Sequence, residues 1–467
     1  MFLVALAAIA MVALAGLGVK WLLEFQHRAS RITWREFKIG MAISPVVAAL
    51  VAWAGWAMAR QSKLTFSEYW NGWEVSTVKE FTPCTRDGPC RWEYDCDPYI
   101  VMVPYTCNCT TDSKGNTSCS TCYRPETRYH SCPYVKNEYH FYTDSTLGRF
   151  SIATHVLPDN PQAHRWRAGV LVPRSVIERA GTGEPLFWVA ARNRCDASAP
   201  GPVTARRDYV NYILASEHTL MKEYSGDIAD YRLRKLLPPL SRTVQSFYQA
   251  DKVYFVGWQP ADHRVWQKAL EYLNANFGRQ MQGDLHVVVV RDEAVERNPD
   301  RYALALKAHW QDKKIYGHDS LSKNAVVAVV GTKDGFMVSW SRAFTGMPLG
   351  NEKLIVMMRD GLKGPPLTFA ALIGPIASRR DAKGVQYPAD SMYYSPLQRL
   401  LWGMDDPATK FKRISMSGKD GQGGFLYLKN EIQPSTGQMW AIFMVTFLLC
   451  CGVWLWAAMH RDPSERQ

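Results

Sequence analysis

The sequence has none of the short motifs that identify the common classes of enzyme. It contains no glycine-rich phosphate loop, no HExxH helix and no GxSxG nucleophile elbow. The stretch GLKGPP at residues 361–366 lacks both the spacing of a phosphate loop and its terminal serine or threonine. No nucleophile, base and orienting group stand in a recognisable pattern. These absences favour a non-catalytic protein and leave an enzyme as the alternative.

Long runs of like charge are also missing. The formal net charge is +12, but apart from one short basic loop the positive side chains are spread thinly among acidic ones. A nucleic-acid-binding protein would concentrate them in a patch or stripe. The composition therefore argues against nucleic acid as a partner, and the same charge suits a face that lies near anionic lipid.

Three long apolar runs are present, at residues 1–24, 40–59 and 439–459. Each contains about the 18 to 20 apolar residues that a helix needs to cross a bilayer. We predict three transmembrane helices. A cleaved signal peptide is a weaker interpretation of the first run, because Met1 and Phe2 provide no basic side chain before it. A buried core hairpin is the other alternative.

The connecting loop at residues 25–39 sets the expected orientation. It carries four basic side chains against Glu36, and short basic loops stay on the cytoplasmic side of a membrane. We therefore expect the N-terminus outside, the tail at residues 460–467 in the cytoplasm, and residues 60–438 in the periplasm or outside the cell.

Cysteine is concentrated in one segment, which we assign to an extracytoplasmic module at residues 60–140. Its eight cysteines are Cys84, Cys90, Cys96, Cys107, Cys109, Cys119, Cys122 and Cys132. Thiols oxidise outside the cytoplasm, so we predict a disulfide-stabilised module of loops and a hairpin. Eight cysteines allow about 105 pairings, and the sequence does not choose among them. The role of Cys195, a ninth cysteine in this region, is open.

Two other chemistries fit the same cysteines. Cys107, Cys109, Cys119 and Cys122 on the two arms of a hairpin are a candidate four-thiolate zinc site, with His130 and His140 as further ligands. A redox pair at Cys119 and Cys122 is the third alternative, although it lacks the helix N-terminus that lowers a thiol pKa.

The rest of the external region predicts an α+β segment at residues 141–250 and an α/β sandwich at 251–365. In the first, short strands at 139–144, 149–157, 168–173 and 185–192 precede a helix over 206–224 and then, over 233–249, a second helix or a proline-interrupted pair of helices. In the second, strands at 252–258, 285–290 and 325–330 alternate with helices at 263–277 and 299–310. A hairpin turn at 332–335 leads to a strand at 336–340 and a helix at 351–362. Residues 366–438 extend to the membrane.

The stretch 250–365 resembles the TPM domain family, whose members are small membrane-tethered domains. The resemblance rests on the strand LHVVVV, on the helix that ends at Trp310 and is followed by Gly317, and on Asn324 before AVVAVV. It implies an α/β sandwich and an association with calcium binding, acid phosphatase activity or the assembly and repair of membrane complexes. By position, the implied calcium ligands are Asp292, Glu293, Asp319 and Asp334.

The sequence as a whole thus predicts a membrane-anchored α+β protein with three transmembrane helices, a cysteine-rich disulfide module and a TPM-like α/β sandwich ectodomain. We expect a non-catalytic scaffold or accessory factor for a membrane complex, with the bilayer and a membrane protein as its partners. A metal-dependent phosphohydrolase of the TPM type is the alternative. A receptor or adhesion protein that binds through the cysteine module is the third. Calcium, and zinc as the less favoured metal, are the candidate cofactors.

Overall fold

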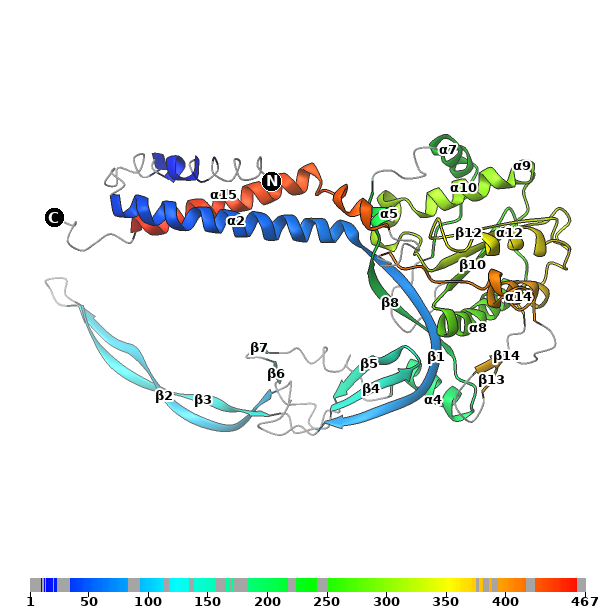
Figure 1. Ribbon diagram of the computed structural model, residues 1–467. Coiled ribbons are helices and arrows are strands. Elements are labelled where there is room, and N and C mark those ends of the chain that lie inside the picture. Colours follow the sequence, from blue (N-terminus) through cyan, green and yellow to red (C-terminus); the bar gives the residue numbers. More distant parts are fainter. Residues whose placement is uncertain are drawn as a thin grey trace.

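The computed structural model combines a pair of long helices, an antiparallel sheet, an α/β domain and a projecting hairpin (Figure 1). It describes residues 10, 12, 14–19, 21–22, 34–82, 93–111, 117–133, 138–156, 165–167, 170–171, 184–216, 224–241, 251–374, 378–380, 386–388, 394–416 and 425–459. The fold is mixed α+β, as the sequence predicts. The predicted turn at 113–116, the loop 25–33 and the tail 460–467 lie outside the described residues.

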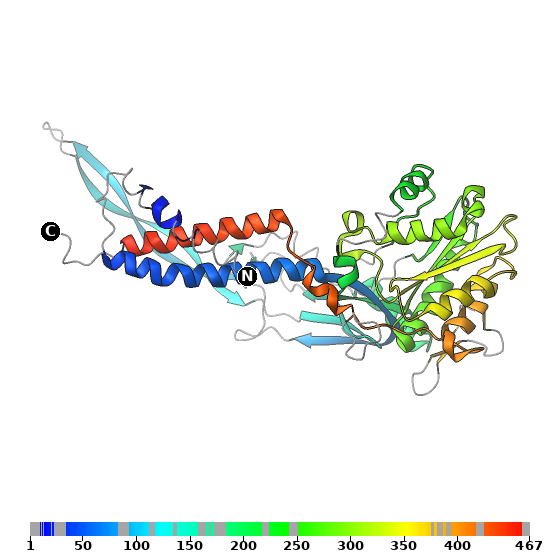
Figure 2. The same cartoon turned by 45° about the horizontal axis from the view of Figure 1, so that its top comes forward.

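Two helices are long and apolar enough to cross a membrane. They are α2 (Trp34–Leu64) and α15 (Thr436–Met459), which contain apolar spans of 27 and 22 residues. They contain the second and third apolar runs, and they lie side by side (Figures 1 and 2). Much of the first run lies outside the described residues. Of its described side chains, Val12, Ala15 and Val19 pack in one apolar cluster with Ala48 of α2 and Trp454 of α15.

The two long helices approach each other closely where one of them has glycine. A Cβ atom added to Gly40 would lie 2.5 Å from the ring of Trp454, and one added to Gly55 would lie 3.0 Å from Ile442. Small residues allow this contact, which supplies the van der Waals packing that holds helices together where water is absent.

Helix α2 continues directly into β1 (Thr65–Thr82), the central strand of the sheet β5-β4-β1-β8. The first half of β1 pairs with β8 (Pro202–Val210) and the second half with β4 (Glu138–Ser145), which pairs with β5 (Gly148–Val156). The predicted helix over 206–224 is therefore wrong in its first part. The backbone of residues 202–210 completes the ladder of β1, and the short helix α5 (Tyr212–Ala215) follows after Asn211.

The cysteine segment forms a long hairpin of β2 (Glu93–Thr111) and β3 (Thr117–Pro133), as predicted. It belongs to the sheet β3-β2-β6-β7, in which β6 is Arg165–Arg167 and β7 is Val170–Leu171. Both views show the hairpin extending away from the α/β domain in the same direction as α2 and α15 (Figures 1 and 2).

The α/β domain has the sheet order β12-β11-β10-β9. Its strands are β9 (Val253–Val256), β10 (Asp284–Val290), β11 (Ala325–Gly331) and β12 (Trp340–Thr345), of which the first three are parallel. Its main helices are α8 (His263–Met281), α9 (Glu293–Arg297), α10 (Pro299–Trp310) and α12 (Glu352–Gly361). The predicted order of strands and helices is confirmed for residues 251–362.

One strand of this domain is placed differently from the prediction. The antiparallel partner of β11 is residues 340–345, not 336–340, and residues 332–339 form a longer loop. The carboxylate of Asp334 accepts hydrogen bonds from the backbone N–H groups of Phe336 and Met337, at 2.8 and 3.1 Å. Those two N–H groups are engaged in the loop, so the strand begins later.

Both faces of the α/β sheet are covered. Val288 and Val290 pack toward α10, whereas Leu285, Val287 and Val289 pack toward α8 and α12. A strand buried on both faces needs apolar residues at successive positions, which accounts for the unbroken run LHVVVV. The other elements are α4 (Leu186–Asp196), α7 (Ser225–Leu233), α11 (Lys313–Tyr316), η1 (Gly317–Asp319), α13 (Phe369–Leu372), β13 (Ser378–Arg380), β14 (Gln386–Pro388), α14 (Pro396–Trp402), η2 (Pro407–Thr409) and η3 (Leu426–Asn430).

One local prediction in the α+β segment is wrong, and another is contradicted in its first half. Residues 185–192, expected as a strand, begin the helix α4, in which Trp188 and Ala191 are buried. Of the helical segment expected over 233–249, the described residues 234–241 are not helical and residues 242–249 lie outside the described residues; the helix α7 (Ser225–Leu233) precedes it.

Candidate functional site

Three of the four implied calcium ligands lie at the carboxyl edge of the parallel sheet. Asp292 and Glu293 follow β10, and Asp334 follows its neighbour β11. The two strands stay paired to their ends, where the N–H of Thr332 donates to the carbonyl of Val290 at 3.0 Å. Ligands of open α/β sheets bind at this edge, so the position itself suits a site.

The two aspartates at this edge have local structural roles. Asp292 is the N-cap of α9, and its Oδ1 accepts from the N–H groups of Ala294 and Val295, at 2.9 and 3.2 Å. Asp334 closes the loop after β11 in the same way, and the N–H groups of Phe336 and Met337 hold the pKa of its carboxyl below its usual range. Glu293 is exposed.

Asp319 lies in η1, before β11 begins, and so at the opposite end of that strand. It accepts a hydrogen bond from the hydroxyl of Tyr69 and forms an ion pair with Arg206, both at 3.3 Å. The four carboxylates therefore do not form one site. Within the described residues, no three His, Cys, Asp or Glu side chains are close enough to hold a metal ion together. Calcium binding stays a prediction for the carboxyl edge alone.

A buried ion pair that the sequence analysis missed lies at the other end of the sheet. Nζ of Lys252 lies 2.5 Å from Oδ1 of Asp284, and both side chains are almost fully buried. Asn71 of β1 donates to the same Oδ1 at 2.9 Å. Burial alone would raise the pKa of Asp284, but Lys252 and then His286 beside it hold that pKa well below its ordinary value.

His286 completes this buried cluster. Its Nε2 lies 3.2 Å from Oδ2 of Asp284 and its Nδ1 lies 3.2 Å from the hydroxyl of Tyr254. His286 is therefore a buried histidine with both ring nitrogens engaged. The cluster comprises one cation, one carboxylate and their hydrogen-bond partners, all held within packed strands, so it fixes strand positions and presents no group to a substrate.

The same cluster fastens β1 to the α/β domain. Oδ1 of Asn71 accepts from the hydroxyl of Thr204 in β8, while Nδ2 of Asn71 donates to Asp284 in β10. Two residues further along β1, Nε1 of Trp73 donates to Asn276 of α8 at 3.2 Å. Gly278 of α8 rests on the backbone of Asn71 so closely that an added Cβ would lie 2.5 Å from its carbonyl oxygen.

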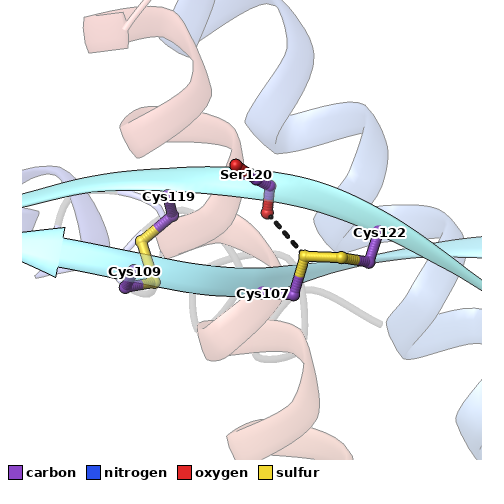
Figure 3. The surroundings of a disulfide bond; sticks show 5 residues. All are labelled: Cys107, Cys109, Cys119, Ser120 and Cys122. Atoms are coloured by element: carbon purple, nitrogen blue, oxygen red, sulfur yellow. Dashed lines mark hydrogen bonds between the residues drawn. A yellow bond between two sulfur atoms is a disulfide. The ribbon is translucent and has the colours of Figure 1, made fainter.

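The cysteine hairpin is cross-linked twice near its tip (Figure 3). Cys107 pairs with Cys122 and Cys109 pairs with Cys119, with Cα–Cα distances of 5.7 and 4.0 Å. Disulfides in the module are thus confirmed for four of the eight predicted cysteines. These are also the four thiols that the zinc alternative requires. Cys84 and Cys90, and the side chains of Cys96 and Cys132, lie outside the described residues.

The two faces of the hairpin differ in charge. Residues directly opposite in an antiparallel pair point to the same face, so the register places Val103 and Tyr105 with Arg124, Glu126 and Arg128 on one face. The other face has no charged side chain between residues 98 and 104 or between their partners 123 and 127. We call it the uncharged face; its described residues are Pro98, Ile100, Met102, Pro104, Tyr123, Pro125 and Thr127.

Three large side chains of the uncharged face are unusually open to solvent. The exposed fractions are 71% for Ile100, 55% for Met102 and 61% for Tyr123. Apolar side chains grouped in this way mark an interaction surface more often than a solvated one. The alternation in YIVMVP could have revealed it, but only with the register of β3 in hand.

A cavity of about 220 Å³ lies between α8 and the segment around α14. Its lining consists of Leu273, Asn276, Gln280, Tyr394, Gln398, Trp402 and Met404. These side chains offer amides and aromatic surface and no group that would act as a base or nucleophile at neutral pH.

A scan against protein-family models, a search of curated proteins and a search of solved structures each found no match to this chain.

Proposed function

We propose that the protein is a membrane-anchored, non-catalytic scaffold that contacts a second membrane protein through the uncharged face of its cysteine hairpin. It would thereby act as an accessory or assembly factor of a membrane complex. The observation that carries the proposal is the exposure of Ile100, Met102 and Tyr123 on one side of a hairpin that extends in the same direction as α2 and α15 (Figure 1).

The mounting of the hairpin supports this role. The two disulfides restrain the hairpin near its tip. The strand that precedes the hairpin in the chain, β1, is held in its own sheet by β4 and β8. A rigid surface loses less entropy on binding than a mobile one. The buried ion pair of Lys252 and Asp284 holds β1 against the α/β domain, so the platform behind the hairpin is also fixed.

The chemistry of the hairpin favours a protein over lipid as its partner. Its backbone edges carry N–H and C=O groups that a bilayer interior cannot satisfy, and its other face carries Arg124, Glu126 and Arg128. A protein of the same membrane can cover the apolar side chains while it leaves the charged face in water or pairs it. The hairpin extends in the same direction as α2 and α15 (Figure 2), which brings it within reach of a protein in the same membrane.

Site-specific photo-cross-linking tests the proposal. Benzoylphenylalanine at Ile100, in the full chain in membranes of its native host, is expected to form an adduct with one protein that resists alkaline extraction. The control position is Arg124, on the charged face of the same hairpin. The adduct should disappear when Met102→Asp is added. Equal adducts from both faces, or adducts with lipid alone, would overturn the proposal, and an adduct with a soluble protein would favour the receptor alternative.

The phosphohydrolase of the TPM type stays the second candidate, because Asp292 and Asp334 follow neighbouring parallel strands. Both the family resemblance and calcium binding remain proposals. Asp292→Asn tests them, since asparagine keeps the cap of α9 and removes the charge that a hard cation needs. Metal-dependent turnover of a phosphate monoester that this substitution abolishes would replace the scaffold proposal.

A further inference from the structure

The short helix η3 lies at the end of the membrane helix α2. A guanidinium nitrogen of Arg60 donates to the carbonyl of Lys429 in η3, and Nζ of Lys63 donates to the carbonyl of Gln433 at 2.5 Å. Six residues beyond η3, the chain enters α15. The segment 425–435 is therefore held at the same height as the last turn of α2.

Helix geometry fixes that height relative to a bilayer. Lys38 and Arg60 bracket the apolar part of α2 and lie about 33 Å apart at 1.5 Å per residue. This distance matches the ~30 Å hydrocarbon core. With α2 in the membrane, Arg60 lies among the lipid headgroups, and η3 must lie there with it. Arg60 also stacks 5.0 Å above the ring of Trp56, and the exposed Trp440 lies in the first turn of α15, as aromatic residues do at this level.

The two sides of η3 have different surroundings. Phe425 and Leu428 pack inward against a cluster that includes Leu64 and Phe66, where the membrane helix meets β1. Leu426 and Tyr427 point away from that cluster and are 50% and 67% exposed. In water these two side chains would gain nothing from their position. At the boundary between headgroups and acyl chains, both would bury apolar surface, and tyrosine suits that boundary because its ring is amphipathic.

Cations surround this pair. Arg60 and Lys63 use carbonyl oxygens as their partners, and Lys429 is exposed. Glu431 is the one nearby carboxylate in the segment, so the local balance is positive. No carboxylate among the described residues forms an ion pair with Arg60, Lys63 or Lys429, which leaves their charges for anionic groups outside the chain.

We infer that η3 is an interfacial foot: Leu426 and Tyr427 enter the headgroup region of the bilayer, and Arg60, Lys63 and Lys429 bind the phosphates of anionic lipids. This inference rests on the membrane anchoring in the proposed function. It adds a third point of contact with the lipid surface, outside both apolar helices, and it selects for anionic lipid. The foot would fix how far the α/β domain stands from the membrane.

Photo-cross-linking in lipid nanodiscs tests the insertion of the foot. Benzoylphenylalanine replaces Tyr427 in the full chain, and lipid adducts are counted by mass spectrometry. Leu50, which is 61% exposed on α2, is the positive control for the membrane. Phe336, which is 75% exposed in the loop at the carboxyl edge of the sheet, is the negative control. Lipid adducts at 427 and 50 but not at 336 are expected.

The outcomes separate the two proposals. Adducts at 50 without adducts at 427 would overturn the foot and leave the membrane anchor intact. No adduct at 50 would overturn the anchor itself, and the foot with it.

A second measurement tests the charge selection. Native mass spectrometry compares retained phosphatidylglycerol with retained phosphatidylcholine for Lys63→Gln and Lys429→Gln, with Lys333→Gln as the remote control. Glutamine at position 63 keeps an N–H donor for Gln433 and loses the charge. Each foot variant should lower the ratio of anionic to neutral lipid by about five-fold, and an unchanged ratio would refute the role of the cations.

Discussion

Removal of the Lys252 charge is expected to destabilise the junction between β1 and the α/β domain. In the intact pair the side chains of Lys252 and Asp284 are 2% and 1% exposed. Lys252→Met leaves the Asp284 carboxylate buried without this cation. Breaking a buried pair on one side costs about 3–5 kcal/mol. His286 and Asn71 still contact Asp284, so the lower part of that range is expected.

The loss of stability caused by Lys252→Met should depend on pH, and it should be larger at high pH than at low pH. In the intact protein the folded pKa of Asp284 lies below its unfolded value, so this carboxylate stabilises the fold above about pH 4 and loses that effect as the pH falls. In the variant, burial raises the folded pKa instead. In the variant, the ionised Asp284 lowers the free energy of unfolding at high pH, and this loss becomes smaller as Asp284 is protonated. The difference in free energy of unfolding between the intact protein and Lys252→Met should therefore narrow from pH 8 to pH 5.

Urea unfolding of the full chain in detergent, followed by tryptophan fluorescence, measures this difference. The neutral double variant Lys252→Met/Asp284→Asn should recover most of the loss, because asparagine still accepts from Asn71 and no unpaired charge remains. Lys333→Met, which removes an exposed lysine paired with Glu296, is the matched control and should change little. A small loss that does not vary with pH would refute the reasoning.

Three further predictions follow from the same structure. Gly278→Ala in α8 should lower the free energy of unfolding in urea by about 1–3 kcal/mol, because the new Cβ meets the backbone of Asn71. Gly226→Ala has open space around it and should leave the free energy of unfolding unchanged. Equal effects of the two substitutions would contradict the close contact. Cys107→Ser/Cys122→Ser removes the outer of two nested disulfides. Because Cys109–Cys119 still closes the inner loop, the loss should be smaller than the ~3 kcal/mol of an isolated 15-residue loop; proteolysis of the hairpin should speed up, while chelator should release no thiol from the intact protein. Burial, followed by the charge of Asp251, raises the pKa of Glu271 to about 6. The fold therefore loses stability as the pH rises from about 4 to 6. Glu271→Gln should stabilise the protein by about 1 kcal/mol at pH 8 and not at pH 4, as measured by thermal unfolding at both pH values.

The parts of the fold that the sequence predicts are those with strong local signals. The valine-rich strands β10 and β11 are buried on both faces, and α10 has the N-cap Asn298 with Pro299 in its first turn. Each of these elements can be predicted from residues that are neighbours in the sequence. The hairpin follows from the spacing of the cysteines. The disulfide pairing does not, because it depends on the register of β2 against β3.

The missed features depend on partners far away in the chain. Residues 206–210 are expected to begin a helix, yet they form the end of β8 because β1, more than 130 residues earlier, offers a free ladder. Lys252 and Asp284 look like ordinary residues at strand ends until Asn71 covers them. The implied calcium set is split because Asp319 precedes β11 and Asp334 follows it, an order that the predicted strand at 325–330 already contained.

The direct passage from α2 into β1 leaves no flexible linker between the long apolar helix and the sheet that follows it. No loop interrupts the chain between Trp34 and Thr82, and the carbonyl of Leu64 already accepts from the N–H of Asn211 at 2.9 Å. The sheet therefore cannot swivel freely about the axis of α2. If α2 spans a bilayer as proposed, any tilt that a thinner bilayer imposes on the helix must reappear as a change in the angle at which the sheet meets a partner in the same membrane.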